Sequence, residues 1–345
     1  MLENVARKMW RRVQSWFVAN AEHVTVMFIP ADDGEPLLPN GGYVRLWASE
    51  GFLAQQRTWG IDRFPALHGG VSLNVLGAPA TFTTFARPPD AWTTPGAQLD
   101  FRITTLLPYT GGSVELEAAL YQASSNGPLG TAVELISGLA SLMGPPLATA
   151  AAVADKVSDG LDAVLAAGGD QPVLGVHWSM VAAGGRGNVL RPGHLAVIAT
   201  PPHRLGGTPV IKDGRLYLRT ERDLRQLTGV DYLVLWVECR TERDDWRLPE
   251  LDALIRTAGD ELIRGLQEAF AERRTEAIAR AWNSADLTPP DRRRVALLVK
   301  EELDSLGQLG AVPGPESTLD SIAPLRLPSA DDDRLADLTL ARLLT

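Results

Sequence analysis

Charged side chains are scarce in the middle of this chain. Residues 64–200 contain 14 charged side chains in 137 positions, whereas the other 208 positions contain 61. The segment 135–154 has no charged residue at all. Because a soluble surface normally has charges of both signs throughout, we expect this region to be covered by another subunit, a protein partner, the flanking parts of the chain or lipid.

Cysteine and net positive charge are also lacking. Cys239 is the single cysteine, so no intramolecular disulfide can form and a reducing cytoplasm is the best-fitting compartment. Cys239 lies in an apolar run, which indicates a packed thiol. The net charge is −9, and phosphate neutralisation needs a basic field. No nucleic-acid partner is therefore expected.

The familiar catalytic and cofactor motifs are missing from the sequence. It contains no GxxxxGK[ST], no strand-borne GxGxxG before a helix, no HExxH, no GxSxG and no CxxC pair. Neither a cofactor nor a metal is predicted. One catalytic hypothesis is left: His177 and Ser179 share a strand face because they are two positions apart. The alternative interpretation of His177 is a structural histidine.

Short runs rich in β-branched and aromatic residues predict strands on both sides of the chain's centre. They occur within 22–122 and again within 172–239, separated by glycine and proline turns. Residues 212–215 (KDGR) predict a hairpin turn. This spacing favours an antiparallel β-sandwich. Trp47, Trp59 and Trp92 fall in or near loops, where they either line a ligand surface or pack at the rim.

A helical insertion is predicted at 128–168. Its first segment ends at Gly144, Pro145 and Pro146, because proline cannot continue a helix. The second segment has an apolar, small-residue face opposite an acidic one. We expect Leu139, Leu142, Leu161 and Val164 to make the contacts of this insertion.

Helices are predicted again at the two ends of the chain. Residues 251–282 form one long amphipathic pattern, and a second helix begins after Thr288, runs to about Leu306 and stops at Gly307. A proline-rich linker then leads to a short terminal helix containing Leu335 and Leu338. This helix either docks on a partner or folds back onto its own core.

The first 20 residues predict a basic amphipathic helix that contains Trp10 and Trp16. Such a helix can lie on an anionic lipid surface or dock on an acidic partner. The third interpretation is packing against its own domain.

Together these patterns predict an α+β fold. Its parts are the N-terminal helix (1–20), a β-sandwich-like domain (21–246) with the helical insertion 128–168, a helical layer (247–310), and the linker with its terminal helix (311–345). The function that fits best is a non-enzymatic cytoplasmic assembly or adaptor protein, a homo-oligomer or a binder of protein partners. The alternative is a membrane-active effector that releases 128–168 to lipid, with peripheral membrane association, and an enzyme of unfamiliar type is the third hypothesis.

Overall fold

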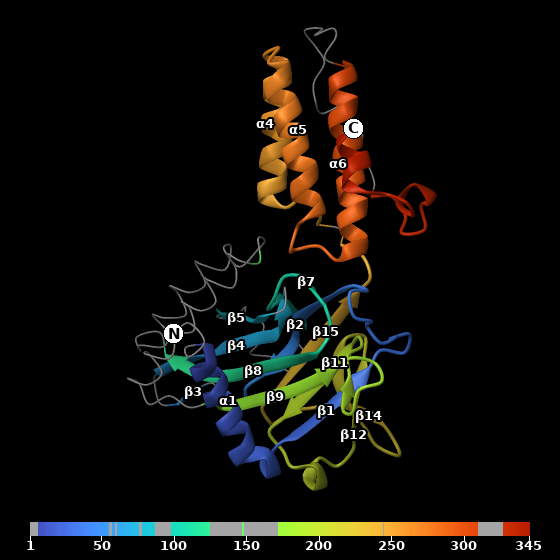
Figure 1. The fold of residues 1–345 in the computed structure, drawn as a ribbon. Coiled ribbons are helices and arrows are strands. Elements are labelled where there is room, and N and C mark those ends of the chain that lie inside the picture. The colour runs from blue at the N-terminus through green and yellow to red at the C-terminus, as the bar shows by residue number, and fades with distance from the viewer. Residues whose placement is uncertain are drawn as a thin grey trace. The chain divides into compact units, whose positions relative to one another are not determined.

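The computed structural model describes residues 6–54, 57–58, 61–75, 78–86, 98–124, 147, 172–243, 245–309 and 327–345. The chain divides into two compact units, Met1–Thr241 and Glu242–Thr345, called unit 1 and unit 2 below. Unit 1 is rich in strands and unit 2 is helical (Figure 1). This confirms the predicted α+β fold with a C-terminal helical layer.

The described strands of unit 1 form two larger sheets. The first sheet has the strand order β1-β11-β15-β2-β6, with β7 paired to β2. Its strands are β1 (Thr25–Pro30), β2 (Tyr43–Phe52), β6 (Gln98–Arg102), β7 (Leu107–Pro108), β11 (Gly193–Ile198) and β15 (Tyr232–Arg240). The second sheet has the order β10-β9-β8-β4-β3, with β5 paired to β4. Its strands are β3 (Arg57–Thr58), β4 (Ile61–Val75), β5 (Ala78–Ala86), β8 (Ser113–Ser124), β9 (Leu174–Val181) and β10 (Asn188–Val189).

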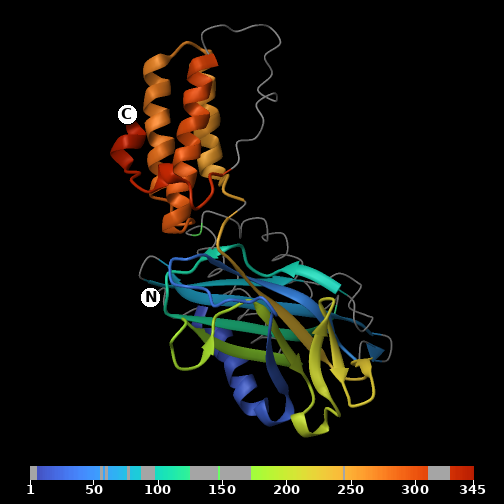
Figure 2. The same cartoon turned by 90° about the vertical axis from the view of Figure 1, so that its right-hand side faces the viewer.

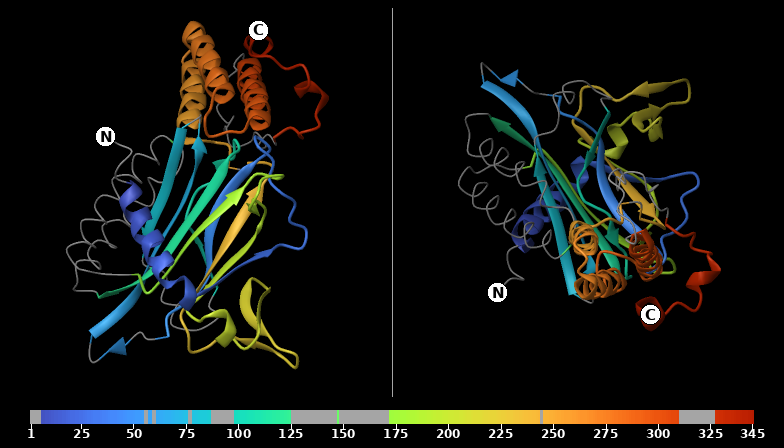
Figure 3. Two further views of the ribbon diagram at one scale, coloured as in Figure 1. Left: turned by 60° about the horizontal axis from the view of Figure 1, so that its bottom comes forward. Right: turned by 90° about the horizontal axis from the view of Figure 1, so that it is seen from above.

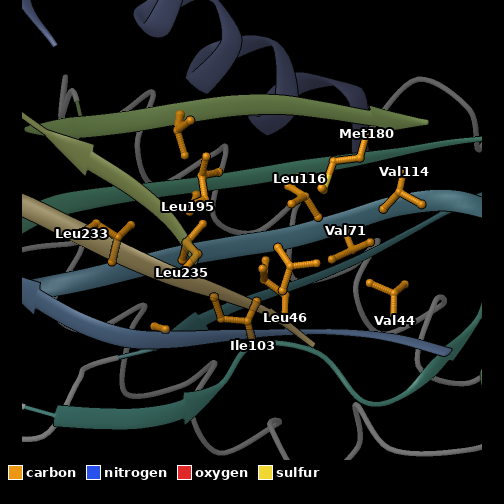
Figure 4. Close-up of a cluster of buried hydrophobic side chains, with 14 of the residues drawn as sticks. Val44, Leu46, Val71, Ile103, Val114, Leu116, Met180, Leu195, Leu233 and Leu235 are labelled. Atoms are coloured by element: carbon orange, nitrogen blue, oxygen red, sulfur yellow. The ribbon is translucent and has the colours of Figure 1, made fainter. Parts of the chain in front are cut away.

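The core of unit 1 lies between the inner faces of these two sheets. Alternate residues of each strand point inward, as period-two patterns require. Leu46 and Leu235 of the first sheet belong to one buried cluster with Val71, Leu116 and Met180 of the second (Figure 4). The pairing is antiparallel along the first sheet, so the structure confirms a sandwich-like arrangement.

A small third sheet belongs to unit 1 as well. It consists of β12 (Thr208–Lys212), β13 (Arg215–Arg219) and β14 (Leu224–Gln226). Lys212 pairs with Arg215, and Asp213 and Gly214 between them have φ of 52° and 72°. Two successive left-handed residues are the signature of a type I′ hairpin, which confirms the turn predicted from the sequence.

Helix α1 (Ala6–Asn20) packs against β9 and β8 (Figure 3). Val13 is completely buried there. A Cβ atom at Gly175 would lie 3.1 Å from the Trp16 ring and 3.3 Å from Val13, so glycine permits this close approach. Of the three interpretations of the basic helix, packing against its own domain is therefore the one that the structure supports. A short 3₁₀ turn at Ala21–His23 follows α1, and another at Pro202–Arg204 lies between β11 and β12.

The fold itself buries part of the charge-poor region. Leu116 and Leu120 of β8 point into the core, while Glu117 and Tyr121 of the opposite face are also 0% exposed. Strands that are buried on both faces contain few charged residues, because both sets of side chains lie away from water. The predicted insertion 128–168 lies outside the described residues except for Leu147, which is 2% exposed and belongs to the core of unit 1.

The described residues of unit 2 form three long helices, α4 (Pro249–Ile263), α5 (Gln267–Trp282) and α6 (Pro289–Leu309), which lie side by side (Figure 2). The prediction of one helix over 251–282 was wrong. The chain leaves the helical conformation at Gly265, whose φ is +75°, and glycine at such a position is a common helix stop. The stop predicted at Gly307 was also wrong. A Cβ at Gly307 would lie 3.7 Å from Phe270, and the helix continues to Leu309.

A buried ionic network stabilises unit 2. The Arg243 side chain is 0% exposed; its Nε donates to Asp245 at 2.7 Å and its Nη1 to the Asp286 carbonyl at 2.9 Å. Asp291 accepts from the Arg243 amide at 3.0 Å and pairs with Arg294 at 2.8 Å. Each buried charge thus has a partner, as burial requires.

The C-terminal segment folds back onto the same unit. It forms a 3₁₀ turn, η7 (Asp333–Leu335), and a short helix, α7 (Leu340–Leu344). Leu335 and Leu343 are buried in the core of unit 2, and Leu338 packs against it. This is the fold-back alternative for the terminal segment.

Candidate functional site

The outer face of the first sheet is divided into a covered and an uncovered part. The small sheet covers one part through a buried apolar cluster (Phe52, Ala196, Ile198, Leu205, Leu216, Leu218, Leu227, Tyr232 and Val234). Glu50 lies within this contact and is 0% exposed. It accepts hydrogen bonds from the amide of Leu216 at 2.7 Å and from the Tyr232 hydroxyl.

A β-bulge in β2 sets which side chains reach this outer face. Val234 pairs with Glu50 and Leu235 with Ala48, so Ser49 is an extra residue without a partner in register. The bulge reverses the alternation. It thereby places both Trp47 before it and Glu50 after it on the outer face.

The uncovered part of the outer face contains an open groove of about 360 Å³. Its described lining residues are Trp47, Ser49, Asp100, His194, Gly214, Trp236 and Glu238. Trp236 pairs in register with Trp47 on one side and with His194 on the other, so three adjacent strands form an aromatic floor. Gly214, at the tip of the β12–β13 hairpin, adds the wall made by the small sheet.

Glu238 is ionised at one end of this floor. Arg45 donates to both carboxylate oxygens, at 2.7 and 3.0 Å, and the Trp47 indole Nε1 donates at 2.6 Å. Burial alone would raise the pKa of Glu238, but these hydrogen bonds and the nearby arginines outweigh it and lower that pKa. The Arg45 guanidinium also lies 4.7 Å from the Trp47 ring centroid, a cation–π distance.

His194 and Asp100 complete the ionisable lining. Burial lowers the pKa of His194 to about 4, so its imidazole is neutral near pH 7. Its ring centroid lies 4.5 Å from that of Trp236. Asp100 is exposed and has a left-handed φ of 45°. Within the described ranges no hydrogen bond or ion pair occupies the Asp100 carboxylate.

The catalytic hypothesis places His177 and Ser179 on the same face of β9, and the structure brings both beside Glu115. The Ser179 hydroxyl donates to Glu115 Oε1 at 2.9 Å, and His177 Nε2 lies 3.4 Å from Glu115 Oε2. Burial lowers the pKa of His177, although the Glu115 charge partly opposes this. The serine hydroxyl thus donates its hydrogen bond to the carboxylate and not to the imidazole. Nucleophilic catalysis needs the opposite order, with the base at the hydroxyl and the carboxylate behind it.

A second histidine–glutamate pair lies deeper in the same sheet. His68 Nε2 is 3.2 Å from Glu117 Oε1, and the two side chains are 2% and 0% exposed. Burial lowers the pKa of His68 to about 4. A neutral imidazole with its proton on Nε2 donates to the Glu117 carboxylate and satisfies part of its hydrogen-bonding capacity. The pair is buried away from solvent and offers a structural bond.

The predicted contact residues lie in three kinds of place. Trp16 packs against the second sheet, and only the backbone of Trp10, in α1, is described. Leu335 and Leu338 belong to the core of unit 2. The four predicted contacts of the insertion, Leu139, Leu142, Leu161 and Val164, lie outside the described residues, so their role in assembly stays a prediction.

Metal ligands, membrane-spanning helices and similarity to known proteins also bear on function. Among the described residues, no group of three or more His, Cys, Asp and Glu side chains is placed to hold a metal ion. None of the described helices is long and apolar enough to cross a membrane. The chain matches no known protein-family model. It also matches no curated protein.

Sequence reasoning named Trp47 as a candidate for a ligand surface but missed Trp236, His194 and Glu238. The structure places Trp47 in strand β2 and not in a loop; Trp59 and Trp92 lie outside the described residues. The missed signal was the alternation in β15, where Trp236 and Glu238 share one face. Its neighbours Leu235 and Val237 face the core.

Proposed function

We propose that this chain is a non-enzymatic binding protein that contacts a protein partner through the groove on the outer face of the first sheet. The observation that supports this most directly is the row of Trp47, Trp236 and His194 that the small sheet leaves uncovered. Tryptophan in a concave, partly apolar site is typical of interaction hot spots. These three side chains do not form a catalytic arrangement of a nucleophile with its base.

The proposal moves the expected contact surface away from the charge-poor middle of the chain. Part of the described stretch of that region is packed inside unit 1, as β8 illustrates, so this part needs no partner to cover it. Homo-oligomerisation through the insertion 128–168 and its release to lipid stay predictions. A cytoplasmic location is part of the proposal, and the single cysteine supports it.

Site-specific photo-crosslinking in the source cell tests the proposal. A photoreactive amino acid replaces Arg102, an exposed residue in register with Trp47. The matched control replaces Arg186, which is exposed in the loop between β9 and β10. We expect a discrete crosslinked protein from position 102 that is lost in a Trp236→Leu background. Crosslinks that are equal at both positions, or that persist without Trp236, would contradict the proposal.

A further inference from the structure

We propose that the groove binds a cationic side chain, arginine or lysine, presented by the protein partner. This inference rests on the proposed function and adds the chemistry that the site recognises. The floor is aromatic and the charged lining groups are carboxylates. A cation gains from both, because the faces of aromatic rings carry negative electrostatic potential.

The charges of the lining favour a cation over an anion. Among the described lining residues, Asp100 and Glu238 are acidic and His194 is neutral near pH 7. Arg45 lies beside the groove and compensates Glu238 through two hydrogen bonds. Arg240 also lies 3.9 Å from Glu238, and Arg102 is on the same face of β6 as Asp100, in register with Trp47. Within the described residues no ion pair holds the Asp100 carboxylate, so this is the acidic group that is left to receive a cation. The net charge of −9 on the whole chain adds long-range attraction for a basic partner.

The protein's own Arg45 shows how a guanidinium fits this surface. It lies 4.7 Å from the centroid of the Trp47 ring while its nitrogens donate to Glu238. Trp236 and Asp100 offer a second aromatic–carboxylate combination in the same groove. We infer that an incoming arginine or lysine uses this second combination as Arg45 uses the first.

The size of the groove fits one side chain and not a folded segment. Its volume of about 360 Å³ is at the lower end of the range for ligand pockets, roughly 300–1,000 Å³. It is open on one side, so a side chain can enter while its backbone stays outside. A single inserted residue also explains how a short row of three aromatic rings can act as the anchor of a larger contact.

Calorimetric titration of the full chain with short peptides tests the inference. The probes are acetylated, amidated pentapeptides, Gly-Gly-Arg-Gly-Gly and Gly-Gly-Lys-Gly-Gly. Their controls are the same peptides with citrulline or norleucine at the centre, which keep the shape and lose the charge. We expect the charged peptides to bind roughly 3- to 30-fold more tightly than the neutral ones, from cation–π stabilisation. We also expect their affinity to fall as salt is raised.

Two separate aspartates, Asp100 and Asp213, provide a test variant and its matched control. Asp100→Asn removes the open carboxylate, and Asp213→Asn removes the charge of another exposed aspartate with positive φ that does not line the groove. Asparagine tolerates the left-handed conformation, so both variants should fold. We expect Asp100→Asn to weaken the charged peptides about two- to fivefold, as for exposed ion pairs. Asp213→Asn should leave binding unchanged. Trp236→Leu should remove the preference for charge.

The possible results separate this inference from the proposed function. Suppose that charged and neutral peptides bind equally, and that the crosslink at position 102 still depends on Trp236. This result would refute the inference of a cationic side chain and would leave the proposal of a protein partner standing. Suppose instead that binding is selective for charge and is weakened by Asp100→Asn, but that no crosslink forms at position 102. This result would refute the proposal that the groove contacts a protein partner. Spermidine serves as the free-cation probe. If it binds more tightly than both peptides and responds to Asp100→Asn, the natural ligand is a small cation and the inference of a partner side chain is wrong.

Discussion

The buried carboxylate of Glu50 should determine whether the small sheet stays in place as the wall of the groove. Its oxygens accept from the Leu216 amide in β13 and from the Tyr232 hydroxyl in β15, and all three residues are 0% exposed. Hydrogen bonds to a charged group contribute about 1.5–3 kcal/mol, and an orphaned buried donor costs about 1–3 kcal/mol. Glu50→Gln keeps one acceptor and should cost about 2 kcal/mol. Glu50→Ala orphans both donors and should cost about 4 kcal/mol.

Hydrogen exchange followed by mass spectrometry measures this effect locally, because it reports on each unit separately in the intact chain. Amides of β12 and β13 should exchange faster in Glu50→Ala, while those of α4 and α5 in unit 2 should not change. Tyr232→Phe should show a coupling of about 1–2 kcal/mol with Glu50→Gln in a double-mutant cycle. Tyr217→Phe, in the same small sheet, is the matched control. Wild-type exchange of β12 and β13 in Glu50→Ala would refute this reasoning.

Three further predictions follow from buried groups. Burial lowers the pKa of His68 to about 4, below its unfolded value near 6.5, so the unfolded chain binds the extra proton. The free energy of unfolding should thus fall by about 3 kcal/mol between pH 6.5 and 4 in urea titrations, with His194 adding to the loss, and the slope should be reduced in His68→Gln. Burial raises the pKa of the Cys239 thiol to about 12, so native protein should react with iodoacetamide at pH 8 at least about a hundredfold more slowly than urea-unfolded protein; equal rates would contradict its packing. Gly175→Ala places a methyl group 3.1 Å from the Trp16 ring and should destabilise the packing of α1 by about 1–3 kcal/mol, which limited proteolysis would detect as faster cleavage near the N-terminus; unchanged cleavage would show that the helix has room to move.

Most of the longer strands could be predicted from the sequence because each of them contains its own pattern, whereas the short strands β3, β10 and β14 were not predicted. Val24 to Pro30, for example, is a short run of apolar and β-branched residues that identifies β1 (Thr25–Pro30), and the hairpin residues Asp213 and Gly214 specify their turn directly. Helix ends were harder. Gly265 stops a helix whereas Gly307 lies inside one, and the two differ in φ, which the sequence does not display.

The groove could not be predicted because it depends on pairing between distant strands. Trp47 and Trp236 are neighbours only through the register of β2 with β15, and the bulge at Ser49 decides which of their neighbours share the same face. The His177 and Ser179 hypothesis was geometrically sound for one strand. It failed to foresee Glu115 of β8, which accepts the hydrogen bond of the serine hydroxyl. The sequence also did not show that the fold itself covers some of the charge-poor strands on both faces.

The most direct test of the central claim is a crystal structure of the full chain grown with the Gly-Gly-Arg-Gly-Gly peptide. We predict the peptide guanidinium in the groove, against the Trp236 ring and within hydrogen-bond distance of Asp100, with Arg45 still paired to Glu238. Peptide bound elsewhere, or a groove filled by another part of the same chain, would contradict the account.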